Sequence, residues 1–267
     1  IGNLGDLSPR GLEALRSCDF IAAEDTRVTL KILNRFGIKK PMTSYFEHNK
    51  LLKGDLIIQR ILAGETCALV TDAGMPAVSD PGELLVRQCA EAGIEIDLVP
   101  GPSACVSALA VSGLPTGRFT FEGFLPVNKL KRKELIASLL NEARTMIFYE
   151  APHKLPYTLR DLAAAFGARK IAIVRELTKI HFQVIRTTLP EAAERFAQNG
   201  PRGEIVLVVA GKSPDKTVMP PLEEAVRTAN QKMARGLPAS LAAKAAAAET
   251  GHKKGDIYKM MGKGDAK

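Results

Sequence analysis

The 267-residue sequence contains no tryptophan, and aromatic residues make up only 5% of it. It also lacks any run of about 20 apolar residues, the length that a helix needs to cross a bilayer. We therefore predict no transmembrane segment. If the protein binds nucleic acid, contacts with phosphate should matter more than stacking on bases. The content of 46% hydrophobic and 25% charged residues is typical of a globular protein and excludes a disordered chain.

Cysteine is scarce and is not arranged for cross-linking. The cysteines show no C-x-x-C spacing and have no histidine close by in the sequence: Cys18, Cys67, Cys89 and Cys105. This excludes a disulfide scaffold and a zinc finger. Free thiols, together with the lack of a charged-then-apolar leader, favour a reducing cytoplasmic location.

Three common catalytic motifs are also missing. No G-x-G-x-x-G stretch joins a strand pattern to a helix pattern, which argues against a dehydrogenase. The segment Gly211-Lys212-Ser213 is similar to the end of a P-loop, but Val206 stands where the first glycine of that motif belongs, so we expect no NTPase. The four histidines form no H-E-x-x-H pair, and we predict no metal site.

Positive charge is concentrated in the second half of the chain. Residues 1–118 contain 12 Lys and Arg against 14 Asp and Glu, whereas residues 119–267 contain 25 against 15. The formal net charge of +8 thus arises from the second half. Such an excess predicts a polyanionic partner, because cations placed near phosphates release counterions. A basic surface that only aids solubility is the alternative interpretation.

Short apolar runs alternate with segments whose apolar residues lie three and four positions apart. The runs predict strands at residues 19–23, 67–71, 94–99, 145–149, 170–174 and 204–209. The other segments predict helices, among them residues 9–18, 55–62, 83–92, 103–112 and 155–166. This alternation indicates an α/β protein with a largely parallel sheet.

Turn residues cluster at Gly113–Gly117, where the charge balance also changes, and this predicts a domain boundary. We expect an N-terminal α/β domain over residues 1–117 and a second α/β domain over residues 118–214. No strand pattern returns after that point, so residues 215–267 should form a small basic helical region. Within it, residues 241–261 predict a helix, a turn and a helix, which would suit either nucleic-acid docking or dimerisation.

Two loops that follow predicted strands carry residues suited to a ligand, because ligands of parallel sheets bind at the carboxyl ends of strands. In the loop 70–82, Asp72 can accept hydrogen bonds from a ligand or can merely cap a turn. In the loop 99–104, the N–H groups at the start of the following helix can bind a ligand, and Ser103 is either a contact or an N-cap.

A third strand end carries Glu24, Asp25 and Arg27. An arginine beside two carboxylates can keep one acid ionised as a general base, and can itself hold a phosphate. An exposed helix N-terminus with acids that favour the helix dipole is the alternative.

Eight segments together resemble, in order and spacing, the motifs of the tetrapyrrole methylase family: Ile1–Leu4, Ala22–Arg27, Thr71–Pro76, Ser79–Gly82, Pro100–Ala104, Phe121–Pro126, Phe148–Glu150 and Arg175–Lys179. The resemblance implies two α/β domains, S-adenosylmethionine in the cleft between them, and a homodimer. Family members also begin with a short strand before Ile-Gly-Asn, which this sequence does not include. Within the family, the chain is similar to the branch that methylates the ribose 2′-hydroxyl of a cytidine in the decoding centre of 16S ribosomal RNA.

The resemblance also implies which residues carry out these tasks. By motif position, the cofactor pocket is expected to contain Thr71, Asp72, Met75, Ser103, Ala104, Tyr149 and Ile205. Asp25 and Glu24 are the candidate bases, with Arg27 on a phosphate. Contacts with RNA, within the small ribosomal subunit, are expected from Asn3, Lys129, Lys131, Arg132, Lys133, Arg175, Lys253 and Lys254.

Two other functions stay open at this point. Relatives in the family methylate tetrapyrrole or corrin rings, and the chain could also be an RNA-binding module without catalytic activity. A steep salt dependence of RNA affinity would separate both RNA-binding functions from the small-molecule methylase.

Overall fold

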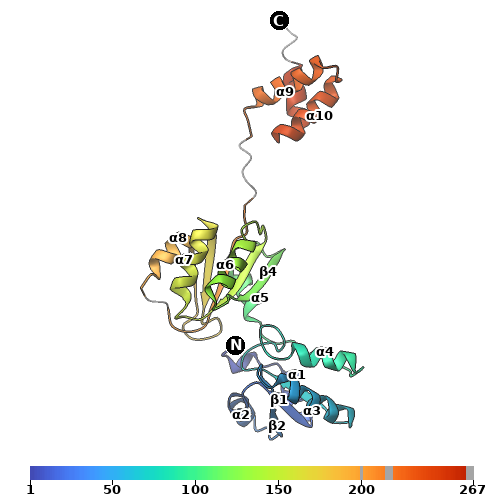
Figure 1. Ribbon diagram of the computed structural model, residues 1–267, viewed down its shortest axis with the longest axis vertical. Helices are drawn as coiled ribbons and strands as arrows, with labels where there is room; N and C mark the ends of the chain where they lie inside the picture. The colour runs from blue at the N-terminus through green and yellow to red at the C-terminus, as the bar shows by residue number, and fades with distance from the viewer. Residues whose placement is uncertain (199–200, 214–218, 263–267) are drawn as a thin grey trace. The chain divides into compact units, whose positions relative to one another are not determined.

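The computed structural model describes residues 1–198, 201–213 and 219–262. The chain divides into two compact units, Ile1–Lys212 and Ser213–Lys267. The described part of the first unit contains two sheets, and that of the second contains helices alone (Figure 1). No helix in the described ranges combines the length and the apolar character that a membrane crossing requires.

The first sheet is parallel, with the strand order β2-β1-β3. Its strands are β1 (Phe20–Ala23), β2 (Met42–Ser44) and β3 (Cys67–Val70). Four helices cover it: α1 (Pro9–Ser17), α2 (Thr26–Arg35), α3 (Lys50–Leu62) and α4 (Glu83–Glu91). The alternating side chains of β1 pack on α1 and α2 through one face and on α3 and α4 through the other. All four residues of this central strand are therefore buried.

The second sheet has the order β4-β5-β8-β6-β7. Its strands are β4 (Phe119–Phe124), β5 (Thr145–Glu150), β6 (Lys170–Arg175), β7 (Gln183–Thr188) and β8 (Ile205–Val209). One face packs on three helices: α6 (Lys129–Ser138), α7 (Leu155–Phe166) and α8 (Leu189–Arg195). The other face packs on α5 (Ala104–Ser112), although this helix precedes the predicted boundary at Gly113–Gly117.

The prediction of a largely parallel sheet is right for the first sheet and wrong for the second. Only β4 and β5 pair in parallel, whereas β8 runs antiparallel to β5 and β6, and β7 runs antiparallel to β6. The connection from β6 to β7, residues 176–182, is too short for a parallel return, which needs a dozen or more residues.

The predicted strand at residues 94–99 is also wrong. These residues form no regular element, and Ile96 and Leu98 are exposed. A strand forms only where a neighbouring strand satisfies its N–H and C=O groups, and no described strand pairs with this segment. The other five predicted strands are confirmed as β1, β3, β5, β6 and β8.

Three strands escaped the sequence analysis because their side chains do not form apolar runs. β2 has three residues, β7 mixes apolar with polar side chains, and the phenylalanines of β4 are separated by Thr120, Glu122 and Gly123. Tertiary pairing overrides such weak local patterns.

The second unit contains α9 (Leu222–Ala234), α10 (Ala239–Thr250) and α11 (Lys254–Met261), which pack through four alanines and Ile257. The predicted helix, turn and helix over residues 241–261 is confirmed. Gly251 ends α10 with a φ of 78°, a left-handed conformation that glycine adopts at little cost.

Leu207, fully buried on β8, provides a test of the second sheet. We expect Leu207→Ala to lower the free energy of unfolding by about 2–5 kcal/mol, because it leaves a cavity between the sheet and its helices. Denaturant unfolding would measure the change. Leu130→Ala, which truncates an exposed leucine on α6, should change it by less than about 0.5 kcal/mol. Equal effects of the two substitutions would contradict this packing.

Candidate active site

The ends of β1 and β3 lie side by side, because Ala23 and Val70 pair in parallel register. The next residues bond to each other across the gap. The backbone N–H of Asp72 donates to Oε2 of Glu24 at 3.1 Å, and the N–H of Asp25 donates to Oδ1 of Asp72 at 3.2 Å. Two of the predicted site loops are thereby joined at one edge of the sheet.

Asp25 caps the N-terminus of α2 and binds Arg27. Its carboxylate accepts the backbone N–H of Arg27 at 2.8 Å and, in a bidentate pair, the guanidinium, with Nη2 to Oδ2 at 2.6 Å. These bonds to Arg27 lower the pKa of Asp25 to about 2. The side chain of Arg27 is 87% exposed, so its guanidinium is oriented by Asp25 and open to a ligand. The structural interpretation of this segment as a helix cap is therefore confirmed, and the binding of a phosphate by Arg27 stays a prediction.

The loop after β3 contacts the loop before α5. The N–H of Gly101 donates to Sδ of Met75 at 3.0 Å. Gly74 has a φ of 87°, and a Cβ there would lie 3.0 Å from the carbonyl oxygen of Pro102. Thr71, which is buried, contributes a hydroxyl that donates to the carbonyl of Gly74 at 3.4 Å. The two predicted cofactor loops therefore pack closely, and glycine is required where they approach.

Tyr149, near the end of β5, supplies the cap that Ser103 does not. Ser103 occupies the N-cap position of α5 but makes no capping bond with its side chain. Instead, the N–H of Cys105 donates to the hydroxyl of Tyr149 at 3.1 Å. Burial raises the pKa of Tyr149, so it stays a neutral phenol at physiological pH. Tyr149 thus ties the predicted cofactor helix, which begins at Ala104, to the second sheet.

Asp80 belongs to the same site, although the sequence analysis did not select it as a functional residue. Burial and the negative charges of Glu24 and Asp72 raise its pKa to about 6. Ala77 and Ser79, which precede it, have φ values of 66° and 65° that non-glycine residues rarely adopt. Strained backbone with a perturbed carboxyl group is a frequent mark of functional sites. In the sequence, Asp80 was marked by its place in the loop 70–82 and in the Ser79–Gly82 motif.

The side chain of the cofactor candidate Ile205 lies on the opposite face of the second sheet from that of Tyr149. It is buried in the cluster with Leu207 and Val209, on the face that packs against α6, α7 and α8. Tyr149 packs in the cluster on the opposite face. Ile205 could therefore offer the site only its backbone.

The predicted RNA contacts are dispersed. Lys129, Lys131 and Lys133 are exposed on α6, whereas the side chain of Arg132 is only 12% exposed and pairs with Asp161 at 2.7 Å. Arg132 also donates to Thr158. Its charge is therefore already paired inside the protein.

The other four candidates lie on different elements. Asn3 accepts the N–H of Gly5 through its side chain, and Arg175 donates to Gln183 and to the carbonyl of Arg202. Lys253 and Lys254 are exposed at the start of α11, in the second unit, where Lys254 donates to Ser240. No group of three or more His, Cys, Asp or Glu side chains suited to a metal ion is found in the described ranges.

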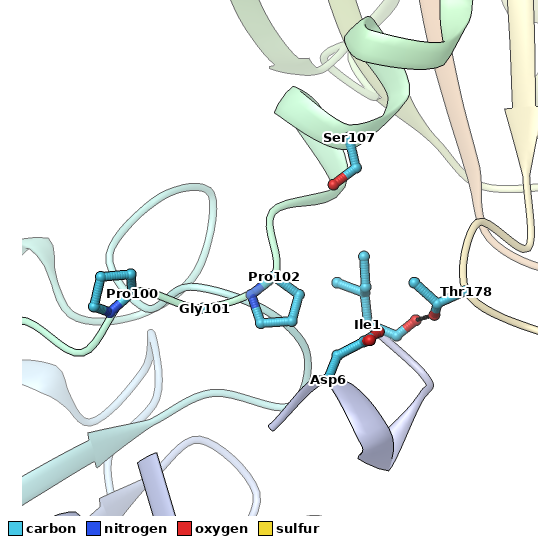
Figure 2. Close-up of a pocket in the computed structure, with 7 residues that line it drawn as sticks. All are labelled: Ile1, Asp6, Pro100, Gly101, Pro102, Ser107 and Thr178. Atoms are coloured by element: carbon cyan, nitrogen blue, oxygen red, sulfur yellow. Dashed lines mark hydrogen bonds between the residues drawn. The ribbon is translucent and has the colours of Figure 1, made fainter. Parts of the chain in front are cut away.

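A cavity of about 480 Å³ adjoins the Pro100–Pro102 segment (Figure 2). Ile1, Asp6, Ser107 of α5 and Thr178 also line it. Thr178 donates its hydroxyl to the carbonyl of Ile1 at 2.6 Å, which joins two of the sequence motifs. None of the seven predicted cofactor residues lines this cavity.

The carboxyl groups at the strand ends can be tested by titration. Glu24→Gln removes a negative neighbour of Asp80, so the pKa of Asp80 should fall from about 6 toward its ordinary value of 3.8. Carbon-detected NMR of the Asp80 carboxyl group would follow the change. Glu13→Gln, which removes the same charge from α1, should leave the Asp80 titration in place. An unchanged pKa in Glu24→Gln would show that the two groups do not interact.

Comparisons with known proteins identify the family and the fold of the chain. The family model described as Tetrapyrrole (Corrin/Porphyrin) Methylases matches residues 1–193. The solved structure of the methyltransferase CobJ, 19% identical, superposes with a TM-score of 0.56 over 79% of this chain and 90% of its own, which shows a shared fold.

Two curated relatives are much more similar in sequence. "Ribosomal RNA small subunit methyltransferase I" of Synechocystis sp. is 44% identical over 97% of this chain and 94% of its own length. The protein of the same name from Thermotoga maritima is 47% identical over 79% of this chain and 95% of its own. The chain therefore belongs to the tetrapyrrole methylase family, as its sequence motifs and its two helix-covered sheets indicated.

Proposed function

We propose that the chain is an S-adenosylmethionine-dependent methyltransferase that methylates the ribose 2′-hydroxyl of a cytidine in the decoding centre of 16S ribosomal RNA. The observation that carries this proposal is the 44% identity over almost the whole chain to a relative named for small-subunit ribosomal RNA. The basic second half supports a polyanionic substrate over a small tetrapyrrole. The choice of a decoding-centre cytidine and of its ribose 2′-hydroxyl rests on the sequence resemblance described above.

The residues of the site fit S-adenosylmethionine. Glu24, Asp72 and Asp80 concentrate negative charge where a positively charged sulfonium would be attracted. The first turn of α5, from Ala104, has N–H groups without helical partners that can bind a carboxylate or the edge of a base. We propose that Thr71, Asp72, Met75, Ser103, Ala104 and Tyr149 hold the cofactor, with the backbone of Ile205 at the margin.

When bound, S-adenosylmethionine supplies an activated methyl group. The protein must align the ribose oxygen with it, and such orientation contributes about 7–11 kcal/mol to catalysis. A carboxylate with a pKa of about 2 is a weak proton acceptor, so we assign to Asp25 the positioning of Arg27. Arg27 then binds a phosphate next to the target nucleotide. Glu24 is left as the acceptor of the hydroxyl proton.

The remaining expectations are part of the same proposal. The substrate is 16S ribosomal RNA within the small subunit, the protein acts in the cytoplasm, and it works as a homodimer. Exposed Lys129, Lys131 and Lys133 on α6 supply phosphate contacts near the second sheet, and Lys253 and Lys254 supply them from the second unit.

The raised pKa of Asp80 predicts how cofactor binding depends on pH. A bound cation favours the ionised carboxylate, so affinity for S-adenosylmethionine should fall as the pH drops through about 6 and Asp80 takes up a proton. If the bound cofactor lowers the pKa of Asp80 by one unit, the protein with an ionised Asp80 binds the cofactor about tenfold more tightly than the protein with a protonated Asp80. Calorimetry between pH 5 and 8, with Asp80→Asn as the comparison, would measure this. Asp80→Asn should bind the cofactor weakly at every pH. If its affinity instead depends on pH as that of the wild type does, Asp80 does not belong to the site.

The function itself is tested by methyl transfer to small ribosomal subunits that lack the modification. With labelled S-adenosylmethionine, we expect incorporation into 16S RNA and a block to primer extension at low nucleotide concentration at one cytidine. Asp25→Asn should lower kcat/KM about tenfold, because Arg27 loses its bidentate partner, while the Kd of the cofactor stays the same. Absence of transfer by the wild-type protein would overturn the proposal.

A further inference from the structure

The loop between β6 and β7, residues 176–182, carries an unusually exposed apolar tip. Ile180 is 98% exposed, the largest fraction of any large apolar side chain in the described ranges, and Phe182 is 47% exposed. His181 lies between them. An isoleucine so exposed contributes no burial to the fold, so its place at the tip needs another explanation.

The base of this loop is firmly held, in contrast to its tip. Nζ of Lys179 lies 3.1 Å from Oε1 of Glu176 and 3.4 Å from Oε2 of Glu204. The N–H of Glu176 donates to the carbonyl of Glu204, and Oε1 of Glu176 accepts the N–H of Glu204 at 3.0 Å. Thr178 adds its bond to Ile1. Glu176 itself has a φ of 51°, which only surrounding contacts can maintain in a non-glycine residue.

The sheet topology places this loop at the same edge as the candidate site. Arg175, the last residue of β6, pairs with Ile205, and Ile205 pairs with Glu150, the last residue of β5. Tyr149 precedes Glu150 on β5 and binds α5. The loop and the predicted cofactor residue Tyr149 therefore lie at the same edge of the second sheet, with β8 between their strands.

A cavity lies directly against the loop. Its volume is about 470 Å³, and it is lined by Gly2, Asn3 and the four residues 178–181. Asn3 uses its side-chain oxygen to accept the N–H of Gly5, which leaves its amide nitrogen available as a donor. The loop thus places the exposed side chain of Ile180 beside a cavity whose lining includes hydrogen-bond donors.

The charge of the α/β domain that carries the loop favours a nucleic acid as the occupant. Within the first unit, residues 119–212 hold 15 Lys and Arg against 9 Asp and Glu. Unpaired RNA bases stack on aromatic side chains such as that of Phe182. Apolar side chains, isoleucine among them, also insert between bases and hold a distorted nucleic acid.

We propose that the β6–β7 loop holds the substrate RNA next to the methylation site, with the side chain of Ile180 packed against an unpaired base. This inference rests on the proposed function, because it requires an RNA substrate. It adds a local apolar contact to a surface whose other expected contacts are with phosphate.

The test compares Ile180→Ala with Leu52→Ala in the full-length chain. Leu52 is a matched control, because it is 78% exposed on α3, beside the first sheet. Affinity for small ribosomal subunits and kcat/KM for methyl transfer are measured for each protein. We expect Ile180→Ala to weaken both about tenfold, because the shorter side chain buries less apolar surface against the base, and Ile180→Leu to restore them. Leu52→Ala should match the wild type, and the Kd for S-adenosylmethionine should be the same in all four proteins.

Each outcome is decisive. If Ile180→Ala binds subunits as tightly as Leu52→Ala does, the loop does not contact RNA and the inference is wrong. If Ile180→Ala instead lowers the fraction of dimer in light scattering, the loop contacts a second copy, which also overturns it. If the wild-type protein binds subunits but transfers no methyl group, the proposed function fails, whereas the affinity comparison still decides the role of the loop.

Discussion

Parallel pairing of β1 with β3 is the constraint on which the candidate site depends. It brings two acidic strand ends together, where Glu24 and Asp72 would repel each other if they were left uncompensated. Each carboxylate instead accepts a backbone N–H from the opposite strand end. The negative charge that remains acts on Asp80. Burial and the repulsion from Glu24 and Asp72 raise its pKa to about 6. A cationic ligand would relieve this repulsion, which links the architecture of the sheet to the proposed cofactor.

The segment after β1 shows how one interaction serves both folding and recognition. Asp25 caps α2, as an acidic residue at that position usually does. The same carboxylate holds Arg27 in a bidentate pair, so the guanidinium is presented to solvent in a defined orientation. The low pKa of Asp25 is a consequence of this pairing. Structural and functional explanations of such a residue are therefore not exclusive.

The second sheet supplies the other side of the site through its antiparallel strands. Because β8 lies between β5 and β6, the segment before Ile205 and the ends of both neighbouring strands lie at a single edge. The short connection from β6 to β7 then projects from that edge. Tyr149, through its bond to Cys105, fixes α5 on the same sheet. The loops proposed to bind the cofactor are in this way mounted on the ends of strands, of which β1 is fully buried and β5 nearly so.

Local sequence patterns determined the α/β class, five of the strands, the main helices and the loops that carry Asp72, Ser103 and Asp25, because burial periodicity and turn chemistry act over a few residues. Only the tertiary structure decided that residues 94–99 form no strand and that the second sheet is mixed, since strand pairing joins segments far apart in the chain. It also decided that Arg132 is already paired with Asp161 and that Asp80 is a perturbed acid. The pKa of a carboxyl group depends on burial and on charges brought near it by folding, and neither is encoded by its immediate neighbours.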